Sequence, residues 1–450
     1  MKTIIKLIAK AIKDTRFEHK TYIVGGFVRD KIMGKFSNDL DVVVDLQNGG
    51  IELADYLFAK RISSRPVIYK RFGTAMCQIA ENKIEFVMAR SESYQENSRK
   101  PEVKTGSIKE DVMRRDFTIN SLVMDISTKK VFDLTGKGLL DIKDKIIRST
   151  GKPDIIFGED PLRMLRAVRF TVQLDFSVEQ NTREGIEKNA PKLQKISWER
   201  KRDELNKILV SPEPDKGIAM LVELELMQYI IPEFKEILNV VQNKYHDKDV
   251  FHHTLDVLVK TPEKLNIRLA ALLHDIGKGR TKTLSETGVH FYGHEKESAI
   301  MAGRILKRLK YSNREIESIC FLIANHMRTK NFGDKAEKVL DKTVRKFILN
   351  TNENLNDLLN LIHADNLSHA NEYSLPSQIP ELKKRIKKLQ SAVVEKQSPV
   401  SGEDIMEQFV IKEGLQVGKL KDEARAIWLE HPQWDKDEII QKLKRNLEKN

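Results

Sequence analysis

Two neighbouring stretches decide the fold: residues 25–30, which read GGFVRD, and residues 38–44, which read NDLDVVV. The two glycines follow an expected strand at 22–24, and a glycine turn that leads into a helix can present its N–H groups to a phosphate. Asp39 and Asp41 stand two residues apart on the next expected strand, so their carboxylates project from one face. Paired carboxylates suit a Mg²⁺ ion that also binds substrate phosphates. Each feature alone is common, but together, at this spacing, they predict a phosphate and magnesium site.

Composition limits the kinds of protein that this chain can be. It has 450 residues, of which 40% are hydrophobic and 32% are charged, and this is typical of a globular protein with several domains. The sequence lacks any run of about 18 uncharged apolar residues, which excludes a membrane-spanning helix. Two cysteines, Cys77 and Cys320, are too few for a disulfide framework and predict a reducing, cytoplasmic location. The lysine-bearing segment 1–15 predicts an amphipathic helix rather than a secretory signal.

The charge balance favours a polyanionic partner. Lysine and arginine number 78 against 66 aspartates and glutamates, so the formal net charge is +12. A basic protein of this size most often carries such an excess for nucleic acid. The alternative is a solvated surface with a lysine bias, so charge alone puts nucleic acid only modestly ahead.

The chain changes along its length from mixed signals to helical ones. Short runs rich in β-branched residues predict strands at 22–24, 40–45, 74–79 and 83–88. From about residue 155 the apolar spacing is near 3.6 and predicts helices at 161–171, 199–209, 216–229, 266–274, 295–309 and 314–326. We therefore expect an α+β protein with an α/β head at 1–145, an all-α neck at 146–235, a helical body at 236–395, a linker at 397–402 and a helical tail over 396–450.

Further motifs follow in a characteristic order. They read RRDFTIN at 114–120, DLTGKGLLD at 133–141 and EDPLR at 159–163. With the two stretches above, they resemble the signature of class II tRNA nucleotidyltransferases, the CCA-adding enzymes, and of related bacterial poly(A) polymerases. The resemblance implies a polymerase-β-like nucleotidyltransferase head in which Asp39 and Asp41 are catalytic and hold Mg²⁺. The nucleotide-binding residues that it implies are Gly25, Gly26, Arg29, Arg114, Arg115, Asp116, Asn120, Asp160, Arg163, Arg166 and Arg169.

The residue types in these motifs support the same chemistry. Arg114 and Arg115 offer forked donors for phosphate or ribose, and Asp116 can accept from sugar hydroxyls, although a surface salt-bridge cluster is the alternative. Glu85, on a neighbouring expected strand, is either a third carboxylate of the site or an ordinary strand acid. Residues 91–107 loosely resemble a flexible loop of the family.

Asp160 and Arg163 lie one turn apart on an expected helix. An aspartate before a proline is also a good helix start, which explains Asp160 but not Arg163. The carboxylate can accept from the exocyclic amine that cytosine and adenine share, and the arginine can donate to the adjacent ring acceptor. Guanine and uracil present neither pattern, so the pair would select CTP and ATP.

A second set of candidate ligands lies in the helical body. Their order resembles the HD phosphohydrolase superfamily, which binds metal through a histidine, a His-Asp pair and a later aspartate. Lone histidines on helices are usually structural, but a full set of candidate ligands in this order favours metal binding instead. Periodicity does not separate His252 from His253, and the His-Thr-Leu context favours His253. The resemblance implies a divalent metal of unknown identity, or two metals, held by His253, His274, Asp275, His294, His326 and Asp365.

Together these motifs predict template-independent addition of CMP, CMP and AMP to tRNA 3′ ends. The partners would be tRNA, CTP and ATP, without a membrane, and pyrophosphate would be released. One alternative is a poly(A) polymerase, or an enzyme that adds only CC or only A. Another is an enzyme whose main activity is HD phosphohydrolysis. A third, a catalytically silent RNA-binding protein, is disfavoured by the intact Asp39, Asp41 and Asp116.

Overall fold

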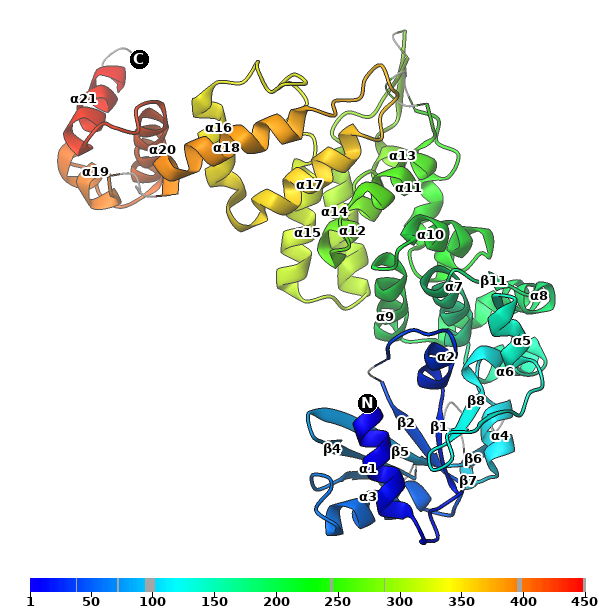
Figure 1. Ribbon diagram of the computed structural model, residues 1–450. Coiled ribbons are helices and arrows are strands. Elements are labelled where there is room, and N and C mark those ends of the chain that lie inside the picture. Colours follow the sequence, from blue (N-terminus) through cyan, green and yellow to red (C-terminus); the bar gives the residue numbers. More distant parts are fainter. Residues whose placement is uncertain are drawn as a thin grey trace. The chain divides into compact units, whose positions relative to one another are not determined.

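The computed structural model describes residues 1–37, 39–70, 73–93, 102–242, 245, 247–286, 288–394 and 399–447. They separate into two compact units, Met1–Pro232 and Glu233–Asn450 (Figure 1). Residues 94–101 of the loop expected at 91–107 lie outside the described residues, as do residues 397 and 398 of the expected linker. Among the described residues, none of the helices is both long and apolar enough to cross a membrane.

One mixed sheet organises the first unit. Within the described residues it has seven strands in the order β3-β4-β5-β2-β1-β8-β9, and only β2 and β5 pair in parallel among them. All four predicted strands are present, although β2 begins at Asp41 and leaves Asp39 just before it. The strands are β1 (Thr21–Val24), β2 (Asp41–Val44), β3 (Val67–Tyr69), β4 (Thr74–Ile79), β5 (Asn82–Met88), β8 (Leu122–Asp125) and β9 (Val131–Asp133), and β6 (Arg90–Ser93) pairs separately with β7 (Glu102–Thr105).

Helices cover both faces of this sheet. Alternate strand residues point to opposite sides, so Val42 and Val44 pack under α1 and α3, whereas Val43 packs under α4 (Figure 1). Asp41 has the same parity as Val43, so its carboxylate lies on the α4 face. The helices of this unit are α1 (Lys2–Ile12), α2 (Gly26–Ile32), α3 (Gly49–Ala59), α4 (Ile108–Met113), α5 (Gly138–Lys143), α6 (Pro153–Glu159), α7 (Leu162–Leu174), α8 (Gln180–Asn189), α9 (Trp198–Leu209) and α10 (Pro214–Glu223).

The segment after the head is helical, as expected, with two differences. β10 (Ile146–Ile147) and β11 (Ser177–Val178) form a two-residue parallel ladder. The helix expected at 216–229 ends at Glu223, and a separate 3₁₀ turn covers Met227–Tyr229. The predicted amphipathic N-terminal helix is confirmed as α1, whose isoleucines at positions 4, 5, 8 and 12 are buried.

The second unit is helical apart from one small hairpin. α12 is apolar on nearly all sides and is buried among its neighbours α11, α15 and α17. The hairpin consists of β12 (Thr283–Ser285) and β13 (Gly288–His290). The last three helices have a hydrophobic core of their own. The helices are α11 (Val250–Lys260), α12 (Leu265–Leu273), α13 (Lys278–Thr281), α14 (His294–Arg308), α15 (Asn313–Asn325), α16 (Asp341–Thr351), α17 (Leu355–Asn366), α18 (Gln378–Val394), α19 (Gly402–Phe409), α20 (Leu415–Glu430) and α21 (Lys436–Leu447).

Candidate functional sites in the two units

Carboxylates gather where β2 begins beside the middle of the parallel strand β5 in the head. Asp41, the first residue of β2, is the register partner of Glu85 on β5, and Asp39 lies just before it, exposed. Burial raises the pKa of Asp41 to about 6, and repulsion from Asp39 and Glu85 adds to this while Arg115 opposes it. The site therefore holds more negative charge than nearby cations balance. Carboxylate oxygens with such an excess fit a Mg²⁺ ion that takes its remaining ligands from phosphates and water.

The glycine turn leaves room beside these carboxylates. Gly25 has a φ of +72°, which L side chains rarely adopt. A Cβ atom there would lie 3.4 Å from Asp41 Oδ2 and 3.6 Å from an Arg115 side-chain nitrogen. The missing side chain thus keeps the space between a carboxylate and a guanidinium open. α2 begins at Gly26, as the sequence predicted.

Arg114 and Arg115 line the same cavity as Asp41 and Glu85, which measures about 460 Å³. Both arginines are held by Asp111, which is buried in α4. The Asp111 carboxylate accepts from Arg114 at 2.6 Å and from Arg115 at 3.0 Å. Burial alone would raise the pKa of Asp111, but the two guanidinium groups lower it below its usual value. Asp111 therefore stays ionised and orients both arginines along one wall of the cavity.

Asp116 is the centre of a buried polar network. One of its oxygens accepts from Arg166 at 2.6 Å, and the other accepts from Asn120 at 3.1 Å. Asn120 in turn accepts from Arg29 at 2.7 Å. The network joins α2, the 3₁₀ turn at Thr118–Asn120 and α7. A sugar hydroxyl bound by Asp116 would share oxygens that already have protein donors.

Asp160 and Arg163 flank the start of α7. Asp160 accepts from Arg200 at 2.8 Å and from the backbone N–H of Leu162 at 3.1 Å. Arg163 donates to the carbonyl of Arg114 at 2.7 Å, to that of Ile156 at 3.0 Å and to Glu159 at 3.0 Å. Arg163 therefore ties α7 to the Arg114–Asp116 segment. Both side chains keep part of their surface accessible, and Asp160 also serves as a helix start.

Arg169, which the resemblance placed among the nucleotide-binding residues, lies in a different environment. Its guanidinium pairs with Glu204 of α9 at 3.0 Å, and both side chains are buried. Burial is the main reason that the pKa of Arg169 falls to about 10. The guanidinium also lies 4.4 Å from the centre of the Phe170 ring. This surrounding favours a structural role that joins α7 to α9.

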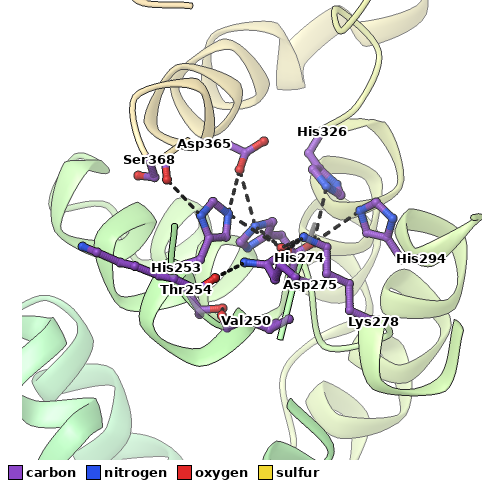
Figure 2. A network of polar contacts seen from close by, with 12 residues as sticks. Val250, His253, Thr254, His274, Asp275, Lys278, His294, His326, Asp365 and Ser368 are labelled. Atoms are coloured by element: carbon purple, nitrogen blue, oxygen red, sulfur yellow. Dashed lines mark hydrogen bonds and ion pairs between the residues drawn. The ribbon is translucent and has the colours of Figure 1, made fainter. Parts of the chain in front are cut away.

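In the second unit, six predicted ligands converge (Figure 2). His253 of α11 lies 3.0 Å from Asp365 of α17. Asp275 follows α12, and one of its oxygens lies 3.1 Å from His274 while the other lies 3.3 Å from His294. Two groups of three have ligand atoms within 4.8 Å of one another, namely His253, His274 and Asp365, and His274, Asp275 and His326. His252, in contrast, is exposed and pairs with Asp249.

The four histidines share one orientation. In each ring Nδ1 lies within hydrogen-bond distance of a backbone carbonyl, at 3.2 Å for His253, 2.8 Å for His274 and His294, and 2.6 Å for His326. A carbonyl can only accept, so Nδ1 carries a proton in each ring, and the neutral form of the ring then presents a lone pair at Nε2. Every Nε2 faces the aspartates (Figure 2). Backbone carbonyls of this kind fix the tautomer of metal-binding histidines.

The charges of this cluster fit a divalent cation. Burial, together with His274 and His294, lowers the pKa of His326 to about 3, so this ring is neutral. Burial opposes ionisation of Asp275, but His274 and Lys278 hold its pKa well below its usual value. His274 Nε2 and Asp275 Oδ1 are buried and have no hydrogen-bond partner within the described residues, and Asp275 Oδ2 forms an ion pair with Lys278 at 2.7 Å. A cation would satisfy these atoms. Three-ligand groups of this kind occur only here in the described chain.

Three family models match separate parts of the chain. Residues 21–148 match the poly A polymerase head domain, residues 175–238 the "Probable RNA and SrmB- binding site of polymerase A", and residues 250–388 the HD domain. The multifunctional CCA protein of Pasteurella multocida is 30% identical over 348 residues, covering 71% of this chain and 77% of its own length. The chain belongs to the CCA-adding enzyme and poly(A) polymerase family.

Other members of this family are similar over different shares of the chain. The A-adding tRNA nucleotidyltransferase of Deinococcus radiodurans is 33% identical over 271 residues, which are 58% of this chain and 60% of that protein. This chain thus spans less than two thirds of the length of that relative. The crystal structure of the Bacillus stearothermophilus CCA-adding enzyme in complex with CTP superposes with a TM-score of 0.71 at 20% identity, covering 100% and 99% of the two chains. This likeness confirms the predicted fold class.

Some residues of the two candidate sites were not predicted from the sequence. Asp111 stands three and four residues before the two arginines, a helical spacing that could have identified it as their partner. Gln242 accepts from Lys278 at 2.6 Å and has no signal in the sequence. Tyr292 lines the cavity beside the histidines and likewise follows no motif.

Proposed function

We propose that the chain adds CMP, CMP and AMP to tRNA 3′ ends from CTP and ATP, with release of pyrophosphate. Membership of the family supports this reaction. The observation that carries it is that Asp41, Glu85 and Arg115 line one cavity, and that Gly25 leaves the space between Asp41 and Arg115 open. A carboxylate edge next to a guanidinium suits a nucleoside triphosphate whose phosphates lie between a metal ion and a cationic wall.

In this reaction the 3′-hydroxyl of the tRNA loses its proton to water and its oxygen bonds to the α-phosphorus, while the bond from that phosphorus to the pyrophosphate oxygen breaks. Asp39, Asp41 and Glu85 would hold Mg²⁺. When bound, the ion lowers the pKa of the attacking hydroxyl and neutralises charge on the phosphates. Arg114 and Arg115, oriented by Asp111, would bind the triphosphate. The reaction does not require a protein group to carry a proton over a long distance. Positioning of the reactants and stabilisation of the phosphate charge therefore account for most of the rate enhancement.

Base selection would fall to Asp160 and Arg163. Each is fixed by neighbours, Asp160 by Arg200 and Arg163 by two backbone carbonyls. A rigid acceptor and a rigid donor at this spacing match the edges of cytosine and adenine and leave an unpaired group opposite uracil or guanine. An unpaired buried group costs about 1–3 kcal/mol, which is enough for useful discrimination.

Addition of A alone is the second candidate function, because a relative with 33% identity is an A-adding enzyme. One experiment separates the possibilities. Purified protein is incubated with tRNA that lacks CCA, CA or A at its 3′ end, each with CTP, ATP, GTP or UTP alone and with CTP plus ATP. Complete CCA on the shortest tRNA supports our proposal. Addition of A alone, or of long A tracts, would replace it, and no addition to any tRNA would refute nucleotide transfer.

For the second unit we propose metal-dependent hydrolysis of phosphate esters. The support is the set of four histidine Nε2 atoms that face the buried carboxylates of Asp275 and Asp365. Asp275 would help to hold metal through both of its oxygens, since one oxygen faces His274 and the other faces His294 and His326. Bound ions would supply an activated water. Lys278 would bind the phosphate near Asp275, from which it lies 2.7 Å away.

A further inference from the structure

The metal-ligand cluster of the second unit forms one side of a cavity of about 960 Å³. This is far more space than a phosphate group needs and lies near the upper end for pockets that enclose a drug-sized ligand, about 300–1,000 Å³. Asp275, His294, His326 and Asp365 line it together with two lysines, Lys278 and Lys330. The cavity therefore has a charged end suited to a phosphate and further volume for the group esterified to it.

An exposed aromatic side chain stands in the wall of this further volume. Tyr292 lines the cavity and is 77% exposed. Its ring lies parallel to that of His290, with an interplanar angle of 7° and centres 5.1 Å apart. One face of the tyrosine ring is thus supported by the imidazole, and the high exposure leaves the other face open. A supported ring with one open face is the arrangement on which nucleobases stack.

The backbone couples this ring to the metal ligands. Tyr292 stands between Phe291, whose carbonyl accepts from His294 Nδ1 at 2.8 Å, and Gly293, which has a φ of +73°. Lys278 Nζ lies 5.5 Å from the centre of the Phe291 ring. The segment that orients one ligand therefore also positions the tyrosine, so a phosphate near Lys278 and a base on Tyr292 would lie in the same cavity.

We propose that Tyr292, backed by His290, is the specificity-determining residue of the second unit and stacks on the nucleobase of a nucleotide phosphoester. The inference rests on the hydrolase function proposed above and narrows its substrates. Small phosphate esters without a planar group would enter the cavity without contacting Tyr292. In the reaction, a water oxygen bonds to phosphorus, the ester P–O bond breaks, and the departing nucleoside oxygen takes up a proton.

Hydrolysis of matched esters tests the proposal. Wild type and variants are assayed with Mg²⁺ and Mn²⁺ on the 2′-, 3′- and 5′-monophosphates of adenosine and on ribose 5-phosphate, which has the same charge but no base. Tyr292→Ala should raise KM for its preferred adenosine monophosphate about 10-fold or more and leave ribose 5-phosphate unchanged, whereas Tyr292→Phe should retain wild-type values. Leu284→Ala is the control, because Leu284 is 79% exposed on the same hairpin but does not line the cavity.

A binding measurement tests the platform without any hydrolysis. The fluorescence of a Tyr292→Trp variant should be quenched by adenosine monophosphate, beyond any change in wild type, and not by ribose 5-phosphate. Leu284→Trp should show no such quenching. Quenching without hydrolysis would uphold the platform and refute the hydrolase. Hydrolysis with equal effects of Tyr292→Ala on both esters, or with no effect on either, would overturn the platform and leave the hydrolase standing.

Discussion

Asp41 and Arg169 are both charged residues of family motifs, yet their surroundings differ. Asp41 lies in the wall of a cavity, and its pKa is raised to about 6 by burial and by neighbouring carboxylates. Arg169 is buried, pairs with Glu204 and lies over the Phe170 ring. The first arrangement leaves charge for a ligand to neutralise, whereas the second is already neutral within the protein. At this scale, the partners of a side chain distinguish a binding group from a structural one.

Replacement of Asp39 or Asp41 by alanine should reduce nucleotide addition at least about 100-fold, because each removes a carboxylate that positions Mg²⁺. Binding of tRNA should survive, since it depends mainly on basic side chains that contact phosphates. Asp45→Ala is a control beyond the opposite end of β2, where Asp45 pairs with Lys20 at 3.5 Å. Addition and tRNA affinity are measured on the same preparations. Near wild-type addition by either alanine variant would refute the assignment of these carboxylates.

Replacement of Asp160 or Arg163 should erode discrimination against UTP and GTP by about 1–3 kcal/mol. Asp160→Asn is the sharper variant, because asparagine can still accept from the N–H of Leu162 at the helix start but no longer offers two acceptor oxygens. Arg200→Ala removes a partner of Asp160 while keeping its carboxylate, and should have a smaller effect. The measurement is the ratio of kcat/KM for CTP to that for UTP. Unchanged ratios in Asp160→Asn and Arg163→Ala would leave Asp160 as a helix start only.

At the scale of elements, both sites lie where several segments meet. Asp41 on β2, Glu85 on β5 and Arg115 after α4 line one cavity in the head. The packing of α7 against α9 supports this region, because α7 also carries Arg163 and Arg166, which contact the Arg114–Asp116 segment. The pair between Arg169 and Glu204 joins these two helices. Loss of this ion pair should therefore affect the stability of the first unit more than it affects nucleotide addition.

Glu204→Ala should lower the free energy of unfolding of the first unit by about 3–5 kcal/mol, because it leaves Arg169 charged, buried and unpaired. Glu223→Ala is the matched control. Glu223 pairs with Arg183 at 3.3 Å, but its side chain is 59% exposed, and such surface pairs contribute about 0–1 kcal/mol. Urea unfolding followed by circular dichroism measures both. Similar small losses in the two variants would show that the buried pair contributes little.

At the scale of the whole molecule, the two proposed chemistries belong to separate compact units, Met1–Pro232 and Glu233–Asn450. The carboxylates of the head and the histidines of the second unit have no residue in common. Each unit has its own buried polar groups and its own cavity. We therefore expect the two activities to be separable by substitution.

The double substitution His274→Ala plus Asp275→Ala should remove bound divalent metal and phosphoester hydrolysis while nucleotide addition remains. His252→Ala is the control, since this exposed neighbour of His253 points away from the cluster and pairs with Asp249 at 2.8 Å. Metal content by elemental analysis, hydrolysis and addition are compared in the three proteins. Equal metal content in the wild type and the double variant would mean that the His/Asp series is structural.

Chelation offers an independent test of the same cluster. Removing the metal should lower the melting temperature of the second unit, because His274 Nε2 and Asp275 Oδ1 would lose the partner that satisfies them. At a metal concentration of 100 Kd the loss corresponds to about 2.7 kcal/mol. Differential scanning calorimetry with and without EDTA measures it. A wild-type melting temperature that is the same with and without EDTA would contradict metal binding.

Sequence alone determined the family, the α+β class, the four predicted head strands, most of the helices that were predicted and the candidate ligands of both sites, because these depend on local spacing and motif order. Tertiary structure alone decided which of these side chains remain available to bind a ligand and which are already engaged by other residues. It placed Glu85 opposite Asp41, engaged Arg169 with Glu204 and separated His253 from the exposed His252. It also brought Asp111, Gln242 and Tyr292 into the sites. Contacts between residues far apart in the chain depend on packing, and a local pattern does not contain them.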